Sequence, residues 1–468
     1  MEITLSNKIT IKNPPEKLKN YLVEKLKVKN PKYYNAIANG YSAWGLDPFI
    51  YNFEMLPDDS LCIPRGCRSL LMEAVGKDVK IKDERAIFDY IDIDSSHIKY
   101  RPYQFDNMIK FLKEGEEGLF IAPAGSGKTV IGISMIPILG QPTLWLTHTR
   151  ALSNQALARI KQFLPGLKDD DVGLIGDGKW KPGKIVTVAL IPTLVRRLKE
   201  LHEMRDDYGL VIVDECHHVP ASTFITVVSN LNPYYLYALT ATPYRRDKLE
   251  TLMFQMIGPK LIHISVSEVE SDGGIMLPLV KYRSIHSKPV YGNKIQEILK
   301  QNIVNNASRN NLIVGDIIRE AVLGNYCIVL TDRKIHAEIL YDLISLGWEK
   351  TGIATGNYTK KYVVEQAEKL DNKEITVLVC TFSLLGEGFD VKFLNRAFIT
   401  MPFRAEGKVE QLVGRIQRTA KGKTDAIVYD YVDVDIGLLQ NQFYTRGKND
   451  CRWNAYNRLG LEIEPYEE

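Results

Sequence analysis

Two series of short apolar runs, separated by stretches with helical spacing, constrain the fold of this chain more than any other feature. Runs of Val, Ile and Leu that are apolar throughout are typical of parallel strands covered on both faces. Their alternation with helices predicts an α/β fold with two successive parallel sheets. The first series comprises residues 118–122, 143–147, 185–189, 210–213 and 237–239, and the second comprises residues 326–330, 350–354, 377–380, 396–400 and 426–432.

A small α+β domain is expected ahead of the two sheets. Residues 3–12 alternate in polarity like a strand or hairpin, and an Asn-Pro-Pro step ends the pattern. Helical spacing follows over residues 16–27, and residues 51–65 have the pattern of a short strand pair. A Ser-Asp-Gly-Gly segment at residues 271–274 predicts a linker. Because 468 residues exceed one hydrophobic core, we expect domains at residues 1–97, 98–270 and 271–468.

Composition excludes several classes of protein. Apolar residues make up 45% and charged residues 25%, which is ordinary globular usage, and the formal net charge of +3 leaves a nucleic-acid partner to be judged from local patches. No apolar run reaches about 18 residues, and the lysine-rich start lacks a signal core, so we expect no membrane span and a cytoplasmic protein, in the host cytoplasm if of phage origin. The six cysteines are expected to be free thiols, because their spacing fits neither a redox pair nor a zinc site. A monomer is expected by default.

A glycine-rich turn joins an apolar run to an apolar helical stretch at residues 119–129, which read LFIAPAGSGKT. Glycines let backbone N–H groups approach phosphate oxygens, and the following helix N-terminus favours negative charge. Lys128 would meet the β- and γ-phosphates, and the Thr129 hydroxyl would meet Mg²⁺. The first glycine of the strict pattern is replaced by Ala122, and the alternative is a tight turn with a solvated lysine. The expected nucleotide-binding residues are Pro123, Ala124, Gly125, Ser126, Gly127, Lys128 and Thr129.

Two carboxylates end the fourth apolar run, in the segment LVIVDECHH at residues 210–218. Ligands bind at the carboxyl ends of parallel strands, so Asp214 is expected to hold Mg²⁺ and Glu215 to orient and deprotonate the attacking water. The alternative is an Asp-Glu turn that caps the next helix. The phosphate loop upstream favours the catalytic interpretation. His217 is a candidate for coupling the nucleotide to neighbouring motifs, whereas His218 is expected to be structural.

These segments, in this order over residues 100–435, resemble superfamily 2 helicases and translocases of the Asp-Glu-x-His type. Cys216 and the Thr-His-Thr-Arg segment at residues 147–150 resemble XPB-like repair helicases and phage branch-migration and fork-remodelling helicases of the UvsW type. The resemblance implies two tandem RecA-like domains, ATP and Mg²⁺ as cofactors, and DNA as the partner. Residues 1–97 match no motif of the family.

The resemblance assigns roles within the first parallel-sheet domain. Gln104, in an Arg-Pro-Tyr-Gln segment, would recognise adenine, because an amide both donates and accepts; the alternative is a surface glutamine at a helix start. Hydroxyls and an arginine at strand ends suit phosphate oxygens of a nucleic-acid strand. The candidate nucleic-acid contacts here are Thr147, Thr149, Arg150, Thr187 and Thr193. The candidate coupling residues are His217, Thr240 and Thr242.

The second parallel-sheet domain carries the remaining motifs. Residues 326–340 resemble motif IV, Thr381 would contact nucleic acid, and Gly388 and Asp390 would face the nucleotide. Residues 411–418 read QLVGRIQR and match Q-x-x-G-R-x-x-R, motif VI. The candidate catalytic residues of this motif are Gln411, Arg415 and Arg418. The two arginines are three residues apart, so we expect them on one helical face, from which they would reach the γ-phosphate; the alternative is a solvated basic face.

Three aromatic or basic segments are candidates for the surface that binds the partner, and each also has a structural interpretation. Residues 1–32 hold eight lysines and three glutamates, and Trp180 lies among three lysines in a Gly/Pro-rich loop. Trp180 would stack on a base or wedge a junction, or else anchor the loop. The cluster Tyr444, Arg446, Lys448, Arg452 and Trp453 would contact DNA, or else pack as a helix on the second sheet.

The expected function is an ATP-driven helicase or translocase that moves on or remodels branched or duplex DNA. The alternatives are an RNA helicase and a nucleotide-switched clamp that binds nucleic acid without unwinding it. A clamp needs neither a water base nor an arginine finger, so Glu215 and Arg415 argue against it. In the motor interpretation, ATP completes its site when the two α/β domains close, and hydrolysis releases the closure.

Overall fold

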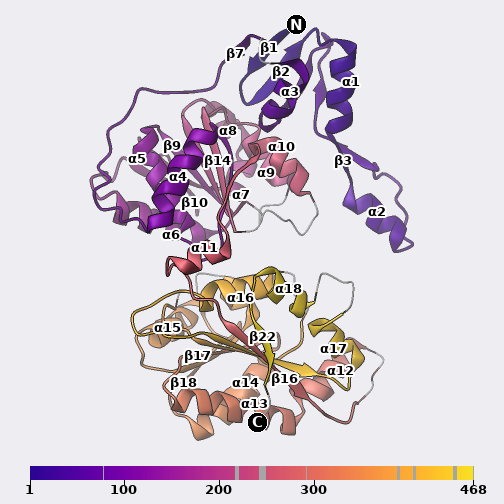
Figure 1. The fold of residues 1–468 in the computed structure, drawn as a ribbon, viewed down its shortest axis with the longest axis vertical. Helices are drawn as coiled ribbons and strands as arrows, with labels where there is room; N and C mark the ends of the chain where they lie inside the picture. The colour runs from indigo at the N-terminus through magenta and orange to yellow at the C-terminus, as the bar shows by residue number, and fades with distance from the viewer. Residues whose placement is uncertain are drawn as a thin grey trace. The chain divides into compact units, whose positions relative to one another are not determined.

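The computed structural model of the chain describes residues 1–76, 79–216, 221–241, 249–290, 292, 294–386, 391–403, 407–445 and 451–466. The chain divides into two compact units. The first unit comprises Met1–Pro123 with Gly127–Ser265, and the second comprises Ala124–Ser126 with Val266–Glu468. Each unit is built around one large parallel sheet with helices on its faces (Figure 1). The predicted fold class, two tandem parallel-sheet α/β domains preceded by a small mixed α+β portion, is therefore confirmed.

The large sheet of the first unit has the strand order β11-β10-β12-β9-β13-β14-β8-β15, and its neighbours pair in parallel except β11, which is antiparallel to β10. All five predicted runs are strands of this sheet, and every residue of β8, β9, β12 and β13 is buried. The strands are β8 (Glu117–Ile121), β9 (Thr143–Thr147), β10 (Val172–Gly176), β11 (Lys179–Lys181), β12 (Val186–Leu190), β13 (Leu210–Asp214), β14 (Tyr235–Thr240) and β15 (Lys260–His263). The helices are α4 (Pro102–Glu114), α5 (Lys128–Leu139), α6 (Arg150–Phe163), α7 (Ile191–Arg196), α8 (Leu198–Glu203), α9 (Ala221–Val228) and α10 (Glu250–Ile257).

The N-terminal portion of the first unit is a smaller sheet of order β5-β6-β2-β1-β7. The predicted hairpin is confirmed, since β1 and β2 pair antiparallel and alternate residues of both strands are buried. Its elements are β1 (Glu2–Leu5), β2 (Lys8–Lys12), α1 (Glu16–Lys25), β5 (Glu54–Met55), β6 (Leu61–Pro64), α3 (Arg68–Val75) and β7 (Ile81–Asp83). A separate pair, β3 (Lys27–Lys29) and β4 (Phe49–Tyr51), carries helix α2 (Pro31–Ala38) between its strands.

A buried ion pair joins the N-terminal sheet to the parallel sheet. The fully buried Arg65 donates from Nε to Glu117 Oε2 at 2.8 Å, and its other nitrogens donate to the carbonyls of Pro233 and Tyr234 at 2.6 and 3.2 Å. Beside it, a Cβ on Gly66 would overlap the backbone of residues 255–258. This contact leaves no room for a side chain, and it explains why the N-terminal sheet belongs to the same compact unit as the first parallel sheet.

The parallel sheet of the second unit has the order β18-β19-β17-β20-β21-β16-β22, and all its neighbours pair in parallel. All five predicted runs are strands of it. The strands are β16 (Leu279–Ile285), β17 (Cys327–Thr331), β18 (Thr351–Ala354), β19 (Val377–Thr381), β20 (Arg396–Ile399), β21 (Ile427–Asp433) and β22 (Ile463–Pro465). The helices are α11 (Val266–Ser271), α12 (Ile295–Leu299), α13 (Ala307–Val322), α14 (Lys334–Gly347), α15 (Lys360–Asp371), α16 (Lys408–Ile416), α17 (Gly437–Phe443) and α18 (Arg452–Arg458).

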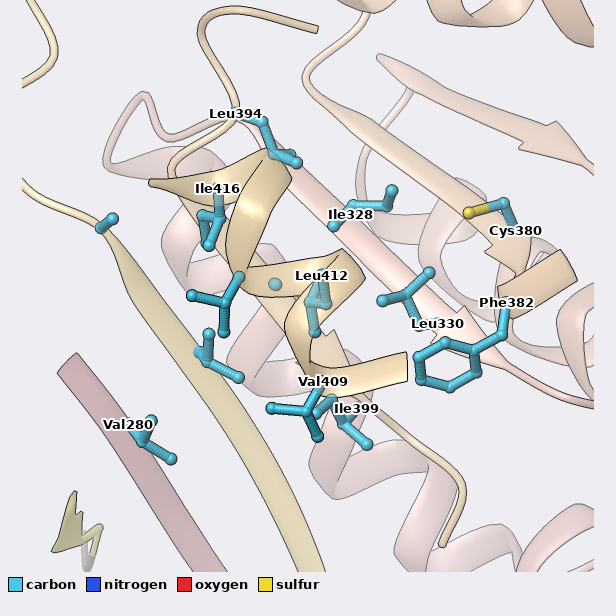
Figure 2. Close-up of a cluster of buried hydrophobic side chains, with 14 of the residues drawn as sticks. Val280, Ile328, Leu330, Cys380, Phe382, Leu394, Ile399, Val409, Leu412 and Ile416 are labelled. Carbon is cyan, nitrogen blue, oxygen red and sulfur yellow. The ribbon is translucent and has the colours of Figure 1, made fainter. Parts of the chain in front are cut away.

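Helix α16 lies with one apolar face on this sheet (Figure 2). Val409, Leu412 and Ile416 recur at the spacing of one helical face and pack against a core that includes Ile328 and Leu330 of β17. Burial of each such side chain contributes about 1.5–3 kcal/mol, so the rotation of the helix about its axis is strongly determined.

The structure also bears on two further predictions, that the cysteines are free thiols and that the chain has no membrane span. The six cysteines are free thiols, as predicted, and all six are buried in the structure. Within the described residues, no helix combines the length and the apolar character needed to cross a bilayer.

The second unit contains a buried, neutral histidine. His336 of α14 is fully buried, and burial lowers its pKa to about 3. Its ring nitrogens lie 3.0 Å from Thr331 Oγ1 and 3.1 Å from Asn310 Oδ1. Both partners are uncharged groups that can hydrogen-bond to a neutral imidazole. Neither of these two contacts supplies a carboxylate that would stabilise a protonated ring.

We predict that acid destabilises the second unit through His336. The unfolded state takes up a proton near pH 6.5, whereas the folded state resists it down to about pH 3. The stability contributed by this group is therefore complete above about pH 6.5 and falls as the pH drops toward 3. Urea unfolding at several pH values should show a weaker acid dependence for His336→Gln than for the wild type. The surface variant His202→Gln is the control, and equal slopes for all three proteins would refute the prediction.

Candidate active site

The phosphate loop connects the end of β8 to the start of α5. Gly125 and Gly127 adopt left-handed backbone conformations, with φ of 82° and 84°. A Cβ on Gly127 would overlap the side-chain amide of Gln104. Only glycine meets both conditions at position 127, because it tolerates positive φ and leaves space for the neighbouring amide.

Lys128, the first residue of α5, turns its ammonium group back over the loop. Its Nζ donates to the carbonyls of Ala122 and Pro123 at 3.1 and 3.4 Å, and lies 3.4 Å from Glu215 Oε1. The side chain is buried. Backbone carbonyls and one carboxylate thus hold a positive charge at the mouth of the loop, where phosphate oxygens would be bound.

The two carboxylates follow β13 as predicted. The strand ends at Asp214, and Glu215 has a left-handed backbone with φ of 49°. A side chain at positive φ is rare and costs about 1–2 kcal/mol, so the surrounding structure must impose this sharp turn. It brings the Glu215 carboxylate to Lys128.

Burial, together with the neighbouring charge of Glu215, raises the pKa of Asp214 to about 7. Two carboxylates so close together disfavour ionisation of each other, and a cation beside them favours it. The Asp214 carboxylate is therefore placed in a site that gains stability from added positive charge.

Three neighbouring strands gather these groups at one edge of the sheet. Strand β14 lies between β13, which delivers the carboxylates, and β8, which leads into the phosphate loop. The buried Thr240 ends β14, and its carbonyl accepts a hydrogen bond from Ala122 N at 3.1 Å. The predicted coupling residue thus contacts the start of the phosphate loop through its backbone.

Gln104 lies beside the same loop, in the first turn of α4. Its Oε1 accepts a hydrogen bond from Arg101 N at 2.9 Å, and the side chain is buried. The alternative of a surface glutamine is therefore wrong. The amide instead touches the phosphate loop at Gly127.

The donor set fits a nucleotide with a bound Mg²⁺. The loop offers backbone N–H groups and Lys128, and the oxygen donors Thr129 and Asp214 are of the kind that Mg²⁺ prefers. Over the described part of the chain, no group of three or more His, Cys, Asp or Glu side chains is placed to hold a metal ion. Mg²⁺ would therefore need phosphate oxygens and water as its other ligands, which is usual for this ion.

Two of the candidate nucleic-acid contacts are engaged inside the first unit. Thr147 is fully buried, with its Oγ1 2.6 Å from Ser153 Oγ. Thr187 is also fully buried; it accepts hydrogen bonds from Gly183 N and from the Tyr208 hydroxyl, both at 3.0 Å. The prediction that these two threonines contact nucleic acid is therefore wrong, because neither hydroxyl reaches the surface.

The other candidates of this unit remain accessible. Thr149 is exposed and caps α6 by accepting from Leu152 N at 3.3 Å. Arg150 is exposed and forms an ion pair with Asp177 at 2.8 Å, and Thr193 is half-buried in α7. Since α6 follows β9, Thr149 and Arg150 lie at the same edge of the sheet as the phosphate loop.

In the second unit, motif VI spans α16 and the residues after it. Gln411 and Arg415 lie on the helix away from its buried face, and burial lowers the pKa of Arg415, whose guanidinium stays charged. The helix ends at Ile416, and Arg418 forms an isolated β-bridge with Ile275. The prediction that the two arginines share one helical face is therefore wrong, because the helix ends before the second one.

Lys423 is a residue that the motif search missed. Its Nζ donates to the carbonyls of Ile416 and Arg418, the latter at 2.8 Å, and burial lowers its pKa to about 8. The lysine thus satisfies carbonyls at the end of α16 and fixes the backbone that carries Arg418. The sequence signal for this contact is weak, because Lys423 comes seven residues after the end of α16.

Thr381 ends β19, with its Oγ1 3.1 Å from Ser383 Oγ. It is buried, whereas Ser383 is exposed. Among the remaining candidates, His217, Thr242, Gly388 and Asp390 lie outside the described residues, as do Arg446 and Lys448.

Two ambiguous aromatic clusters serve packing. Trp180 packs on the core of the first unit, and the Arg197 guanidinium lies 4.2 Å from its ring centre. Arg452 is fully buried and donates to both oxygens of Asp430, at 2.8 and 3.0 Å. These residues anchor their segments, in agreement with the alternative interpretation of each.

Comparison with known proteins gives relatives over most of the chain. The family profile described as "Type III restriction enzyme, res subunit" matches residues 97–245. The chain is 26% identical over 382 residues to a putative ATP-dependent RNA helicase of Acanthamoeba polyphaga mimivirus, covering 78% of this chain and 69% of that protein. It is 23% identical over 374 residues to the probable helicase D10 of Escherichia phage T5, covering 77% of each. A DNA 3'-5' translocase XPB2 of Sulfurisphaera tokodaii is 32% identical over 172 residues, 37% of each chain.

A solved structure shows the same fold. The helicase domain of Pyrococcus furiosus Hef aligns with 79% of this chain and 100% of its own, with a TM-score of 0.52 at 14% identity.

The family profile covers residues 97–245, and the two relatives above that extend over most of the chain are 23–26% identical to it. By sequence, the chain is therefore similar to proteins that are named helicases and translocases.

Proposed function

We propose that this chain hydrolyses ATP to move on or remodel branched or duplex DNA. The observation that carries the proposal is the group at the edge of the first sheet, where Lys128 lies 3.4 Å from Glu215 and the buried Asp214 precedes it. Such a group combines a phosphate-binding cation, a metal-binding acid and a candidate water base.

Each residue of the site has a proposed role. Lys128 binds the β- and γ-phosphates, while Thr129 and Asp214 hold Mg²⁺, which neutralises charge on the phosphates when bound. Glu215 orients the attacking water and takes its proton. Gln104 positions the phosphate loop and pairs with the edge of adenine.

The second unit supplies the remaining roles. Arg415 and Arg418 are proposed to stabilise the charge that develops on the γ-phosphate, and Gln411 to position the nucleophile. Gly388 and Asp390 are proposed to face the nucleotide. Thr381 with Thr149, Arg150 and Thr193 are the proposed contacts with the nucleic-acid backbone.

The choice of DNA rests on resemblance. The archaeal relative is named a DNA translocase, and the motif segments resemble helicases that remodel branched DNA. RNA is the second candidate, because the mimivirus relative is named an RNA helicase. A clamp without productive unwinding is disfavoured by the presence of Glu215 and Arg415.

We predict that forked DNA stimulates ATP hydrolysis most strongly. Steady-state ATPase rates would be measured with no nucleic acid, duplex DNA, forked DNA, single-stranded DNA and RNA at one salt concentration, because phosphate contacts make binding salt-dependent. Equal rates with every nucleic acid would remove the branched-DNA claim, and stimulation by RNA alone would favour the RNA helicase. No stimulation at all would refute the motor.

We predict that Glu215→Gln keeps ATP binding but slows hydrolysis by about 10²–10⁴-fold, because the amide cannot accept the proton of water. Nucleotide binding and single-turnover hydrolysis separate the two effects. Lys128→Ala should abolish turnover, and the surface variant Glu203→Gln should retain the wild-type rate. Wild-type hydrolysis by Glu215→Gln would remove Glu215 from the role of base.

We predict that Arg418→Ala binds nucleotide but turns it over poorly, with a loss that can reach about 10³–10⁵-fold for an arginine finger. Turnover and nucleotide affinity would be measured in the presence of the best nucleic acid. Lys421→Ala, an exposed basic residue close by, is the matched control. Unchanged turnover in Arg418→Ala would mean that this arginine serves only the local fold.

A further inference from the structure

The segment of residues 27–51 forms an arm on the first unit. Strands β3 and β4 make its base, and α2 with residues 39–48 makes its tip. In the base, Val28 and Ile50 pack against Leu252 of α10. Next to it, Asn52 donates to Gln255 Oε1 at 2.8 Å. The base is thus fixed to the body of the unit.

The tip exposes large apolar side chains. Helix α2 contains no buried residue and, in Figure 1, extends away from the other helices of its unit. Four residues of the tip, Tyr34, Ile37, Tyr41 and Trp44, are exposed, with Trp44 at 93% and Tyr41 at 74%. Large apolar side chains that stay exposed in one short segment indicate a binding surface, because they do not contribute to the hydrophobic core of the fold.

The arm carries more lysine than acid. Residues 27–51 contain Lys27, Lys29 and Lys32 and one acid, Asp47. Lys27 forms an ion pair with Glu24 at 2.7 Å, whereas the side chains of Lys29 and Lys32 are exposed to solvent. A surface rich in lysine is unlike the core of a protein–protein interface, where lysine is depleted.

We infer that the arm binds a single strand of nucleic acid, with Tyr41 and Trp44 of the tip stacking on bases, and with Lys29 at the end of β3 and Lys32 at the start of α2 neutralising phosphates. Exposed aromatic faces combined with lysines are the features that bind single strands without sequence preference. A duplex hides its base faces in the stack, so the aromatic residues favour an unpaired strand. The inference rests on the proposed function and adds to it a strand-binding site outside the helicase motifs.

The first test measures binding by the full-length protein without ATP. The probe is a labelled oligothymidylate of roughly 16 nucleotides, the upper site size of single-strand modules. Trp44→Ala and Tyr41→Ala should each weaken binding by roughly 5- to 150-fold, the fold-change that corresponds to the loss of one stacked base. Trp44→Phe should lose less than Trp44→Ala, because it keeps an aromatic face. Leu346→Ala, which removes a side chain 86% exposed on α14, is the control and should bind like the wild type.

The second readout separates stacking from charge. The salt dependence of binding should fall by about 0.7 in log–log slope for each of Lys29→Ala and Lys32→Ala, because each removes one phosphate contact. Trp44→Ala should lower affinity with the slope unchanged. Trp44 is the only one of the five tryptophans in the arm. A change in tryptophan fluorescence on oligonucleotide binding that occurs in the wild type and is absent in Trp44→Phe therefore reports binding at the arm.

The outcomes distinguish the arm from the motor. If Tyr41→Ala and Trp44→Ala bind oligothymidylate as tightly as the wild type and keep normal nucleic-acid-stimulated ATPase activity, the claim that the arm binds a single strand is refuted and the proposed motor function is not. Weakened binding in the variants of a protein whose ATPase is never stimulated would support the arm and refute the motor. A change of oligomeric state in Trp44→Ala with unchanged oligonucleotide binding would overturn the inference in favour of contact between copies of the chain.

Discussion

The structure depends most on one concentration of charge: Lys128, Asp214 and Glu215 at the carboxyl edge of a sheet whose interior is apolar. The sheet can hold these charges because each is presented by a strand end or helix start, where the backbone leaves the core. Burial penalises the negative form of Asp214, and the nearby Glu215 adds to the penalty. The site therefore favours additional positive charge, which a divalent cation bound beside Asp214 would supply.

The order of the strands in the parallel sheet explains how residues that are distant in the sequence meet at the carboxyl ends of the strands. Strands β13, β14 and β8 are adjacent in space although β14 follows β13 and β8 precedes both along the chain. A right-handed crossover between parallel strands places consecutive loops on one edge, so residues distant in sequence meet there. Glu215 completes the arrangement through a left-handed turn that only tertiary structure can impose.

Much of the fold was predictable from sequence, because central strands of a parallel sheet are apolar on both faces. All ten runs are strands, and β9 begins and ends at the predicted residues. The strands without a prediction lie at or near the edges, where the pattern is weaker: β15 is partly exposed, and β16 carries lysine and arginine within it. Pattern alone cannot separate such strands from loops.

Within the candidate site, the placement of some residues follows from a local sequence motif, whereas that of others depends on tertiary contacts. Lys128 and Gln104, which come from local motifs, both contact the glycine-rich loop, and their roles there stay predictions. Thr147 and Thr187 were assigned to a surface from their position in a motif, but their hydroxyls satisfy buried hydrogen-bond partners, which a one-dimensional pattern does not reveal. Arg418 differs because the helix stops two residues earlier, at an end held by a lysine further along the chain.

The buried Arg65 has a consequence for how the chain can be divided. Removing the N-terminal sheet would leave Glu117, at the start of the strand that leads into the phosphate loop, as a buried acid without its guanidinium partner. A shortened protein would therefore lose support at the start of β8, because the N-terminal portion is an integral part of the first compact unit.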